Sequence, residues 1–137
     1  MKVLDNIPIE LDLEAVFNKL NLKNKNADVV EIISQLVDMA RSVARPKAVF
    51  EISGVDNKNG DSLHIHGVKF TSHVLRVNLD KLDTVYPYVV TCGRELDTIN
   101  FPTDELLKAF FWDQIKEVAM RQALYYTHDY IMERQEC

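Results

Sequence analysis

Apolar residues at helical spacing predict two helices in the first third of the chain. Asp12 can cap a short helix, and Asn26 can cap a second one from about Ala27 to Ala44. The second helix should end before Pro46, because the residue before a proline disfavours the helical region. The apolar positions behind these predictions are Leu13, Val16, Phe17 and Leu20, then Val29, Val30, Ile33, Leu36, Val37, Ala40 and Val43.

Alternating apolar and polar residues predict strands in the middle of the chain. Lys47–Ser53 alternates, and Leu63–His66 alternates again after a polar turn at Asp56–Asp61, so the two should pair as a hairpin. Gly67–Phe70 is expected to continue the second strand after a bulge. Tyr86–Thr91 is apolar on both faces, which is typical of a central, covered strand. We expect all of these strands in one sheet.

Two more helices are expected towards the C-terminus. Ser72 can cap a short helix. Pro102–Glu105 predicts the start of a long helix from Asp104 to about Arg134, with Thr103 as the cap, and this helix should pack against the sheet. Its expected apolar stripe consists of Leu107, Phe110, Phe111, Ile115, Val118, Ala119, Gln122, Ala123, Tyr126 and Tyr130.

Composition narrows the class of protein. A chain of 137 residues with 47% hydrophobic and 27% charged residues is expected to form a single domain. The net charge of -5 argues against nucleic acid as a partner. The sequence has no apolar run of transmembrane length and no signal peptide, which predicts a cytoplasmic protein without a membrane partner. The two cysteines, Cys92 and Cys137, indicate neither a disulfide framework nor a metal pair.

The stretch from Val89 to Asp97 is the first candidate site. A buried strand should deliver the small-residue turn Thr91, Cys92, Gly93, Arg94 to a helix that starts at Glu95. Gly93 can turn the chain where a side chain would clash. Exposed N–H groups at a helix start attract anions, and Arg94 would add a positive charge. The alternative is a tight connection with no ligand.

Other groups of residues have plain structural explanations, which we favour. His64 and His66 share a strand face and could hold a metal, but no further ligands cluster with them. Cys92 lacks a signature that would pair it with a catalytic histidine. The acids that flank the buried strand are expected to be solvated, unless burial separates their pKa values. These acids are Asp80, Asp83, Glu95 and Asp97. We assign no catalytic residue.

Aromatic residues on the long helix suggest assembly. Tyr125, Tyr126, His128, Asp129 and Tyr130 could bind a planar or cationic ligand, although packing is favoured. The aromatic residues of the helix cannot all be buried by one face of one sheet, and a large exposed patch is unusual for a monomer. We therefore predict a homodimer, or an obligate partner, formed through the C-terminal half of the helix. The residues concerned are Phe110, Phe111, Trp112, Tyr125, Tyr126 and Tyr130.

Nearly the whole chain resembles the activation domain of cobalamin-dependent methionine synthase, and especially its small stand-alone relatives. Four segments carry the resemblance besides Ser72–Leu79. They are Ala44–Phe50 (Ala-Arg-Pro-Lys-Ala-Val-Phe), Tyr88–Asp97 (Tyr-Val-Val-Thr-Cys-Gly-Arg-Glu-Leu-Asp), Leu106–Ala109 (Leu-Leu-Lys-Ala) and Asp129–Arg134 (Asp-Tyr-Ile-Met-Glu-Arg).

The resemblance implies an α+β fold with a twisted, mainly antiparallel sheet, flanking helices and one long C-terminal helix. In the parent enzyme this domain binds S-adenosylmethionine and supports reductive remethylation of cobalamin, with an electron from flavodoxin. The family's Arg-x-x-x-Gly-Tyr motif for S-adenosylmethionine lies beyond the long helix, and the sequence has no Gly-Tyr dipeptide. Asp129 corresponds loosely to a ligand contact of the family.

Three hypotheses follow from the resemblance. The first, which we favour, is a truncated binding or accessory protein that docks on a corrinoid protein or methyltransferase. The second is a reactivase that binds S-adenosylmethionine with the help of a partner or a dimer. The third is a relative in fold alone, with an unrelated ligand. The expected ligand-binding residues are Thr91, Cys92, Gly93, Arg94 and Asp129.

Overall fold

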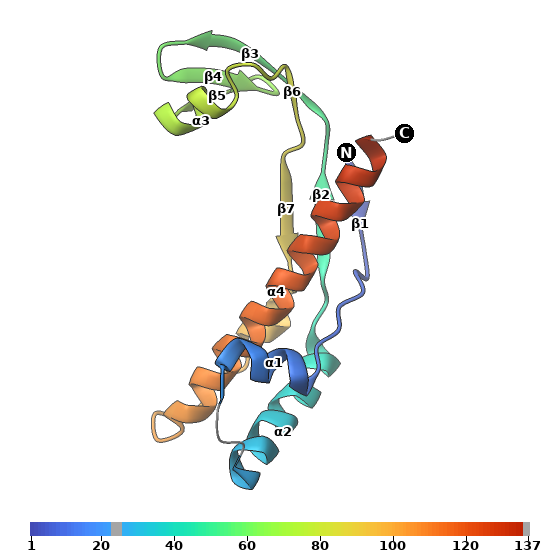
Figure 1. Cartoon of the computed structure of the whole chain (residues 1–137), viewed down its shortest axis with the longest axis vertical. Helices are drawn as coiled ribbons and strands as arrows, with labels where there is room; N and C mark the ends of the chain where they lie inside the picture. The colour runs from blue at the N-terminus through green and yellow to red at the C-terminus, as the bar shows by residue number, and fades with distance from the viewer. Residues whose placement is uncertain (23–25, 136–137) are drawn as a thin grey trace. The chain divides into compact units, whose positions relative to one another are not determined.

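The computed structural model describes the backbone of residues 1–22 and 26–135 and has an α+β fold (Figure 1). The chain divides into two compact units. One consists of Met1–Val3 and Val49–Val89, and the other of Leu4–Ala48 and Val90–Cys137. Across the described residues no helix is both long and apolar enough to span a membrane.

The two N-terminal helices of the larger unit begin where the sequence predicts. The Asp12 carboxylate accepts from Ala15 N–H at 2.9 Å and caps α1 (Leu13–Leu20). Asn26 Oδ1 accepts from Asp28 N–H at 2.7 Å and caps α2 (Ala27–Val43). α2 ends shortly before Pro46, as expected from the restriction that a proline places on its predecessor. The two caps and this stop are therefore confirmed.

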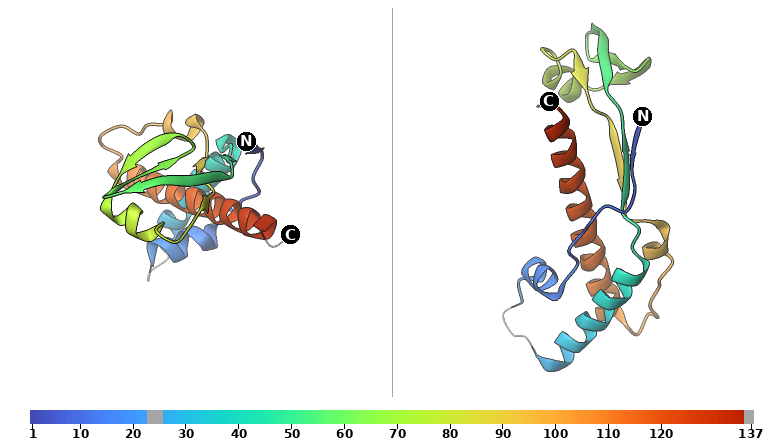
Figure 2. Two further views of the ribbon diagram at one scale, coloured as in Figure 1. Left: turned by 90° about the horizontal axis from the view of Figure 1, so that it is seen from above. Right: turned by 90° about the vertical axis from the view of Figure 1, so that its right-hand side faces the viewer.

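The long helix α4 (Leu106–Gln135) is continuous, but it begins two residues later than predicted. Glu105 N–H donates to Pro102 C=O at 2.9 Å and closes a turn. Thr103 lies inside this turn and does not start the helix. In the right-hand view of Figure 2, α1 and α2 lie beside the N-terminal half of α4, and both contact it.

The predicted apolar stripe of α4 is confirmed in part, because Phe111, Ile115, Val118, Ala119 and Ala123 are buried. Leu107 and Phe110 are exposed by 52% and 51%, and Tyr126 by 37%, so these three positions were wrong. Six of the buried residues follow a row at a spacing of four, which winds around the helix because four residues exceed one turn of 3.6, and Trp112 and Val118 are buried beside it. A stripe drawn straight along the axis therefore selects wrong residues towards both ends of the helix. The buried row is Phe111, Ile115, Ala119, Ala123, Thr127 and Ile131.

The smaller unit contains two consecutive hairpins. β3 (Ser53–Asn59) pairs antiparallel with β4 (Ser62–Ile65), which pairs antiparallel with β5 (Val68–Thr71). The predicted hairpin partner Lys47–Ser53 was wrong, because most of the supposed polar turn is strand β3. His66 and Gly67 have φ of 51° and 77° and form a two-residue reversal, so the expected bulge is a second hairpin turn.

A short helix follows the hairpins. Ser72 Oγ accepts from Leu75 N–H at 3.3 Å and caps α3 (His73–Asn78), so this cap is confirmed. β6 (Thr84–Val85) completes a four-stranded sheet of order β5-β4-β3-β6 by pairing Val85 with Ser53.

A second sheet has the order β1-β2-β7, from β1 (Lys2–Leu4), β2 (Lys47–Phe50) and β7 (Tyr88–Thr91). The prediction of one sheet was therefore wrong. β7 lies at an edge, and Tyr88 and Val89 are exposed, so the expectation of a central, covered strand was also wrong. Pairing each strand with the next strand along the chain gives the wrong sheets here. The segment after β2 bonds instead to the distant segment before β7, where Glu51 N–H donates to Pro87 C=O at 3.2 Å.

We predict that Asp12→Ala lowers the free energy of unfolding by about 1 kcal/mol, because the N–H of Ala15 loses its acceptor. Asp12→Asn retains a capping oxygen and should stay close to the parent. Denaturant unfolding of the three proteins measures the difference. Equal losses for alanine and asparagine would contradict the capping role.

Candidate functional site

The turn after β7 is tied to the segment between α2 and β2. Gly93 has φ 97° and ψ 156°, a conformation that side chains rarely allow, so the prediction that glycine turns the chain here is confirmed. Arg45 N–H donates to Cys92 C=O at 2.8 Å, and Gly93 N–H donates to Thr91 Oγ1 at 3.0 Å. The expected helix after the turn is only one 3-10 turn, η1 (Arg94–Asp97).

Two arginines belong to the surroundings of this turn. A Cβ on Gly93 would lie 3.2 Å from Arg45 Cβ, so these two residues are in close contact. The Arg45 guanidinium donates to the carbonyls of Ser42 and Ala44 at 3.2 and 2.8 Å, at the end of α2. Arg45 and Arg94 are both exposed. The Glu95 carboxylate is closer still, since a Cβ on Gly93 would lie 2.6 Å from Glu95 Oε2. The turn therefore combines two exposed arginines with an acid of its own chain, and this acid would oppose a bound anion.

Cys92 is poorly suited to nucleophilic chemistry. Its side chain is buried, and burial raises the pKa of the thiol above its ordinary value. A nucleophilic cysteine requires the thiolate, which this environment disfavours at neutral pH. Packing is the role that the surroundings of Cys92 support.

A cleft of about 480 Å³ lies on the N-terminal segment of the larger unit. Ala44 and Pro46 contribute to its wall, while Arg45 between them bonds to the turn at Cys92. Thr91–Arg94 does not line the cleft. The volume is in the range of ligand pockets, which is about 300–1,000 Å³. The lining residues are Ile7, Pro8, Ile9, Glu10, Leu11, Asp12, Arg41, Ala44 and Pro46.

Side chains of two helices hold the backbone along this cleft. Gln122 of α4 binds both backbone groups of Glu10, accepting from its N–H at 2.6 Å and donating to its C=O at 2.7 Å. Arg41 of α2 donates through Nε to Leu11 C=O at 2.5 Å, and its Nη1 lies 3.9 Å from Asp38. The Asp12 carboxylate is engaged in capping. Arg41 is therefore the cation of a largely apolar cleft.

Sequence reasoning missed this cleft. Ile7, Ile9 and Leu11 alternate with Pro8 and Glu10, and this pattern indicates an extended segment with one apolar side. The segment is short and contains a proline, so its pattern does not predict a strand. The residues that hold it, Arg41 and Gln122, are remote in sequence.

The structure does not bring Asp129 to the turn. Near the turn, η1 contacts α4 through Trp112 Nε1–H, which donates to Leu96 C=O at 3.0 Å, and through Lys116, whose Nζ lies 3.2 Å from Asp97. Asp129 lies more than three helical turns beyond Lys116, roughly 20 Å along the axis at 1.5 Å per residue. Asp129 is exposed there.

The two strand histidines do not form a pair. His66 occupies the reversal after β4, so it no longer shares a strand face with His64, and its Nδ1 lies 3.9 Å from Glu51. Within the described residues, no three groups of His, Cys, Asp or Glu are placed to hold a metal ion.

The acids that flank β7 are exposed. Asp97 pairs with Lys116, and Asp80 receives a hydrogen bond of 2.5 Å from Arg76, which lowers the pKa of its carboxyl. Asp83 and Glu95 are likewise exposed. Solvated acids of this kind support the structural explanation and not an acid–base pair.

The aromatic cluster late on α4 is open to solvent. Tyr125 is 62% exposed, and His128 is also exposed. The Arg134 guanidinium lies 4.5 Å from the centre of the Tyr130 ring and donates to its hydroxyl at 2.9 Å. Two of the six aromatic residues predicted to form a patch, Phe111 and Trp112, are instead buried.

A polar pocket of about 290 Å³ in the smaller unit was also missed. His73 Nδ1 lies 2.9 Å from Asp61 Oδ1, and Arg76 and Asp80 line the same pocket. Strands β4 and β5 lie between Asp61 and His73 in the sequence, and the hairpin that they form brings the two residues together. Both partners are mostly exposed, which makes the pair a surface contact.

Comparison with known proteins finds no matching family model, no matching curated protein and no matching solved structure.

We predict that Gly93→Ala lowers the free energy of unfolding by about 1–3 kcal/mol, because the Gly93 backbone conformation is almost exclusive to glycine. The new Cβ would also crowd Arg45. Thermal unfolding measures the loss. Gly54→Ala is the control: its Cβ would meet only Asp83 O, at 3.9 Å, and the change should stay within about 0.5 kcal/mol. A Gly93→Ala protein as stable as the parent would contradict the prediction and would mean that the backbone of the turn can change its conformation.

Proposed function

We propose that the protein is a binding or accessory protein related to the activation domain of cobalamin-dependent methionine synthase, and that it acts with a corrinoid protein or methyltransferase. The α+β architecture with one long helix is what the sequence resemblance implies, and it supports the proposal. A binding role also fits a chain whose buried cysteine and solvated acids offer no catalytic set.

The observation that carries the proposal is the apolar surface of the smaller unit. All four residues of β5 are exposed, and β5 is the edge strand of its sheet. Phe70 and Val68 share one face of β5, and each is more than 40% exposed. Val74 and Val77 on α3 are exposed by 66% and 57%. An edge strand with exposed apolar side chains can bind a partner through its unpaired backbone groups and its apolar surface. An accessory protein requires such a binding surface.

The alternative is a reactivase that binds S-adenosylmethionine and needs a partner or dimer to complete its site. The cleft beside Arg41 favours it, because the methionine part of this ligand carries a carboxylate and the cleft offers a guanidinium with apolar walls. The turn at Thr91–Arg94 offers a second place for an anionic group.

Docking is tested by titrating a corrinoid protein, with its methyltransferase, into the chain by calorimetry. Phe70→Ala should weaken binding at least tenfold, because an aromatic side chain that becomes buried in a complex often dominates the interface. Lys69→Ala is the matched control, since it changes the neighbouring residue on the opposite face of β5. If Phe70→Ala binds as the parent does, this surface is not the docking site. No binding by the parent chain contradicts the proposed function.

The alternative is tested by calorimetry with S-adenosylmethionine, with and without the corrinoid protein. If the cleft holds the ligand, Arg41→Ala should lower affinity about tenfold or more, while Arg94→Ala leaves it unchanged. The reverse pattern assigns the ligand to the turn. Absence of heat under both conditions eliminates the reactivase.

A further inference from the structure

The outward face of α4 carries a strip of side chains that recur every three or four residues. This spacing places them on one side of a helix. The strip runs for about 40 Å at 1.5 Å per residue. Seven of its eight members are exposed. The eighth, Glu117, is half-buried as a residue, and its side chain is 42% exposed. The members are Leu106, Phe110, Asp113, Glu117, Arg121, Tyr125, His128 and Met132.

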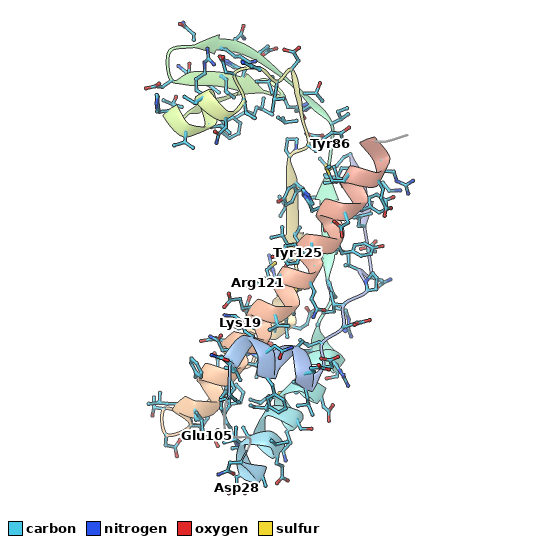
Figure 3. All side chains as sticks on the ribbon, in the orientation of Figure 1. Lys19, Asp28, Tyr86, Glu105, Arg121 and Tyr125 are labelled. Carbon is cyan, nitrogen blue, oxygen red and sulfur yellow. The ribbon has the colours of Figure 1, made fainter. Side chains whose placement is uncertain are left out.

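The middle of the strip carries opposite charges one turn apart. Glu117 lies between two cations, with Lys19 Nζ at 3.4 Å and Arg121 Nη2 at 3.2 Å. In Figure 3, Lys19, Arg121 and Tyr125 follow one another along the same edge of α4. Glu117 and Arg121 remain accessible to a further charged partner, because both side chains are at least 40% exposed.

We infer that two copies of the chain pair antiparallel along this strip, about a two-fold axis that passes between Glu117 and Arg121. In that arrangement Glu117 faces the partner's Arg121, and the symmetry axis repeats the pair. A parallel pairing in register would instead set each charge against its own copy. The order of charges therefore selects the antiparallel arrangement.

The same register matches the rest of the strip. Asp113 faces the partner's Tyr125, which places a carboxylate acceptor opposite a phenolic donor. Phe110 faces the partner's His128, which places two aromatic rings together. Leu106, the most exposed apolar side chain of α4 at 73%, faces the partner's Met132. Four different pairs, each formed twice, are thus chemically complementary in one register.

This surface is separate from the core of the unit. The strip avoids the buried row of α4 that begins at Phe111, and none of its members lines the cleft beside Arg41. Pairing therefore leaves the buried row of α4 in place, with Lys19 of α1 at the border of the strip beside Glu117, and it does not depend on the proposed function.

Charge reversal tests the inference by sedimentation equilibrium. The parent chain should weigh twice its 15.8 kDa at concentrations of tens of micromolar. Glu117→Arg and Arg121→Glu should each weaken the dimer at least tenfold, since each puts two like-charged pairs across the axis. An equimolar mixture of the two variants should recover the dimer, because one copy then carries two cations where the other carries two anions. The double variant should recover it as well.

Lys108→Glu is the matched control. Lys108 of α4 also forms an ion pair, with Glu105, but neither residue belongs to the strip, so its reversal should leave the dimer intact. Circular dichroism verifies that each variant is folded. A monomeric parent chain, single variants that stay dimeric, or a mixture that stays monomeric would each overturn the inference.

Discussion

The segment from Ala44 to Pro46 is the constraint on which the larger unit depends. Arg45 donates its N–H to Cys92 C=O at 2.8 Å, and Pro46 accepts from Ile7 N–H at 3.1 Å. Two adjacent residues thus join two distant parts of the chain to the end of α2. Proline suits this place because it ends the helix and needs no hydrogen-bond acceptor of its own.

Both candidate ligand sites follow from that constraint. The bond to Cys92 brings the Gly93 turn against Arg45, while Ala44 and Pro46 form part of the cleft wall. A substitution at the junction should therefore disturb the turn and the cleft together. The close packing also explains why Gly93 has no room for a side chain, independently of its φ.

Local signals predicted the helices well, because a cap depends on residues close in sequence. Asp12, Asn26 and Ser72 each bind an N–H within three residues, as their types suggest. Strand pairing was predicted poorly, because apolar alternation states which residues form a strand but not which strand lies beside it. The bond between Glu51 and Pro87 spans the whole smaller unit, and no local pattern indicates it.

The candidate site was likewise predictable only where the signal is local in sequence. Gly93 was predictable because a glycine between a strand and a polar segment indicates an unusual backbone conformation. Asp129 was assigned by resemblance alone, and it lies roughly 20 Å along α4 from Lys116, the residue that pairs with Asp97 of η1. The cleft beside Arg41 depends on Gln122 binding the Glu10 backbone, a contact between opposite ends of the chain. Sequence order carries almost no information about such contacts.

The exposed apolar residues differ in what surrounds them, and this difference separates their roles. On β5 and α3, Val68, Phe70 and Val74 are exposed, and a partner that covered them would be held mainly by desolvation. On α4, the strip has charges of both signs in its middle and apolar residues towards its two ends, in an order that is complementary to its own reverse. Ordered charges contribute more to register and partner choice than to affinity. This difference favours a different protein as the proposed partner of β5 and α3, and another copy of the chain as the proposed partner of α4.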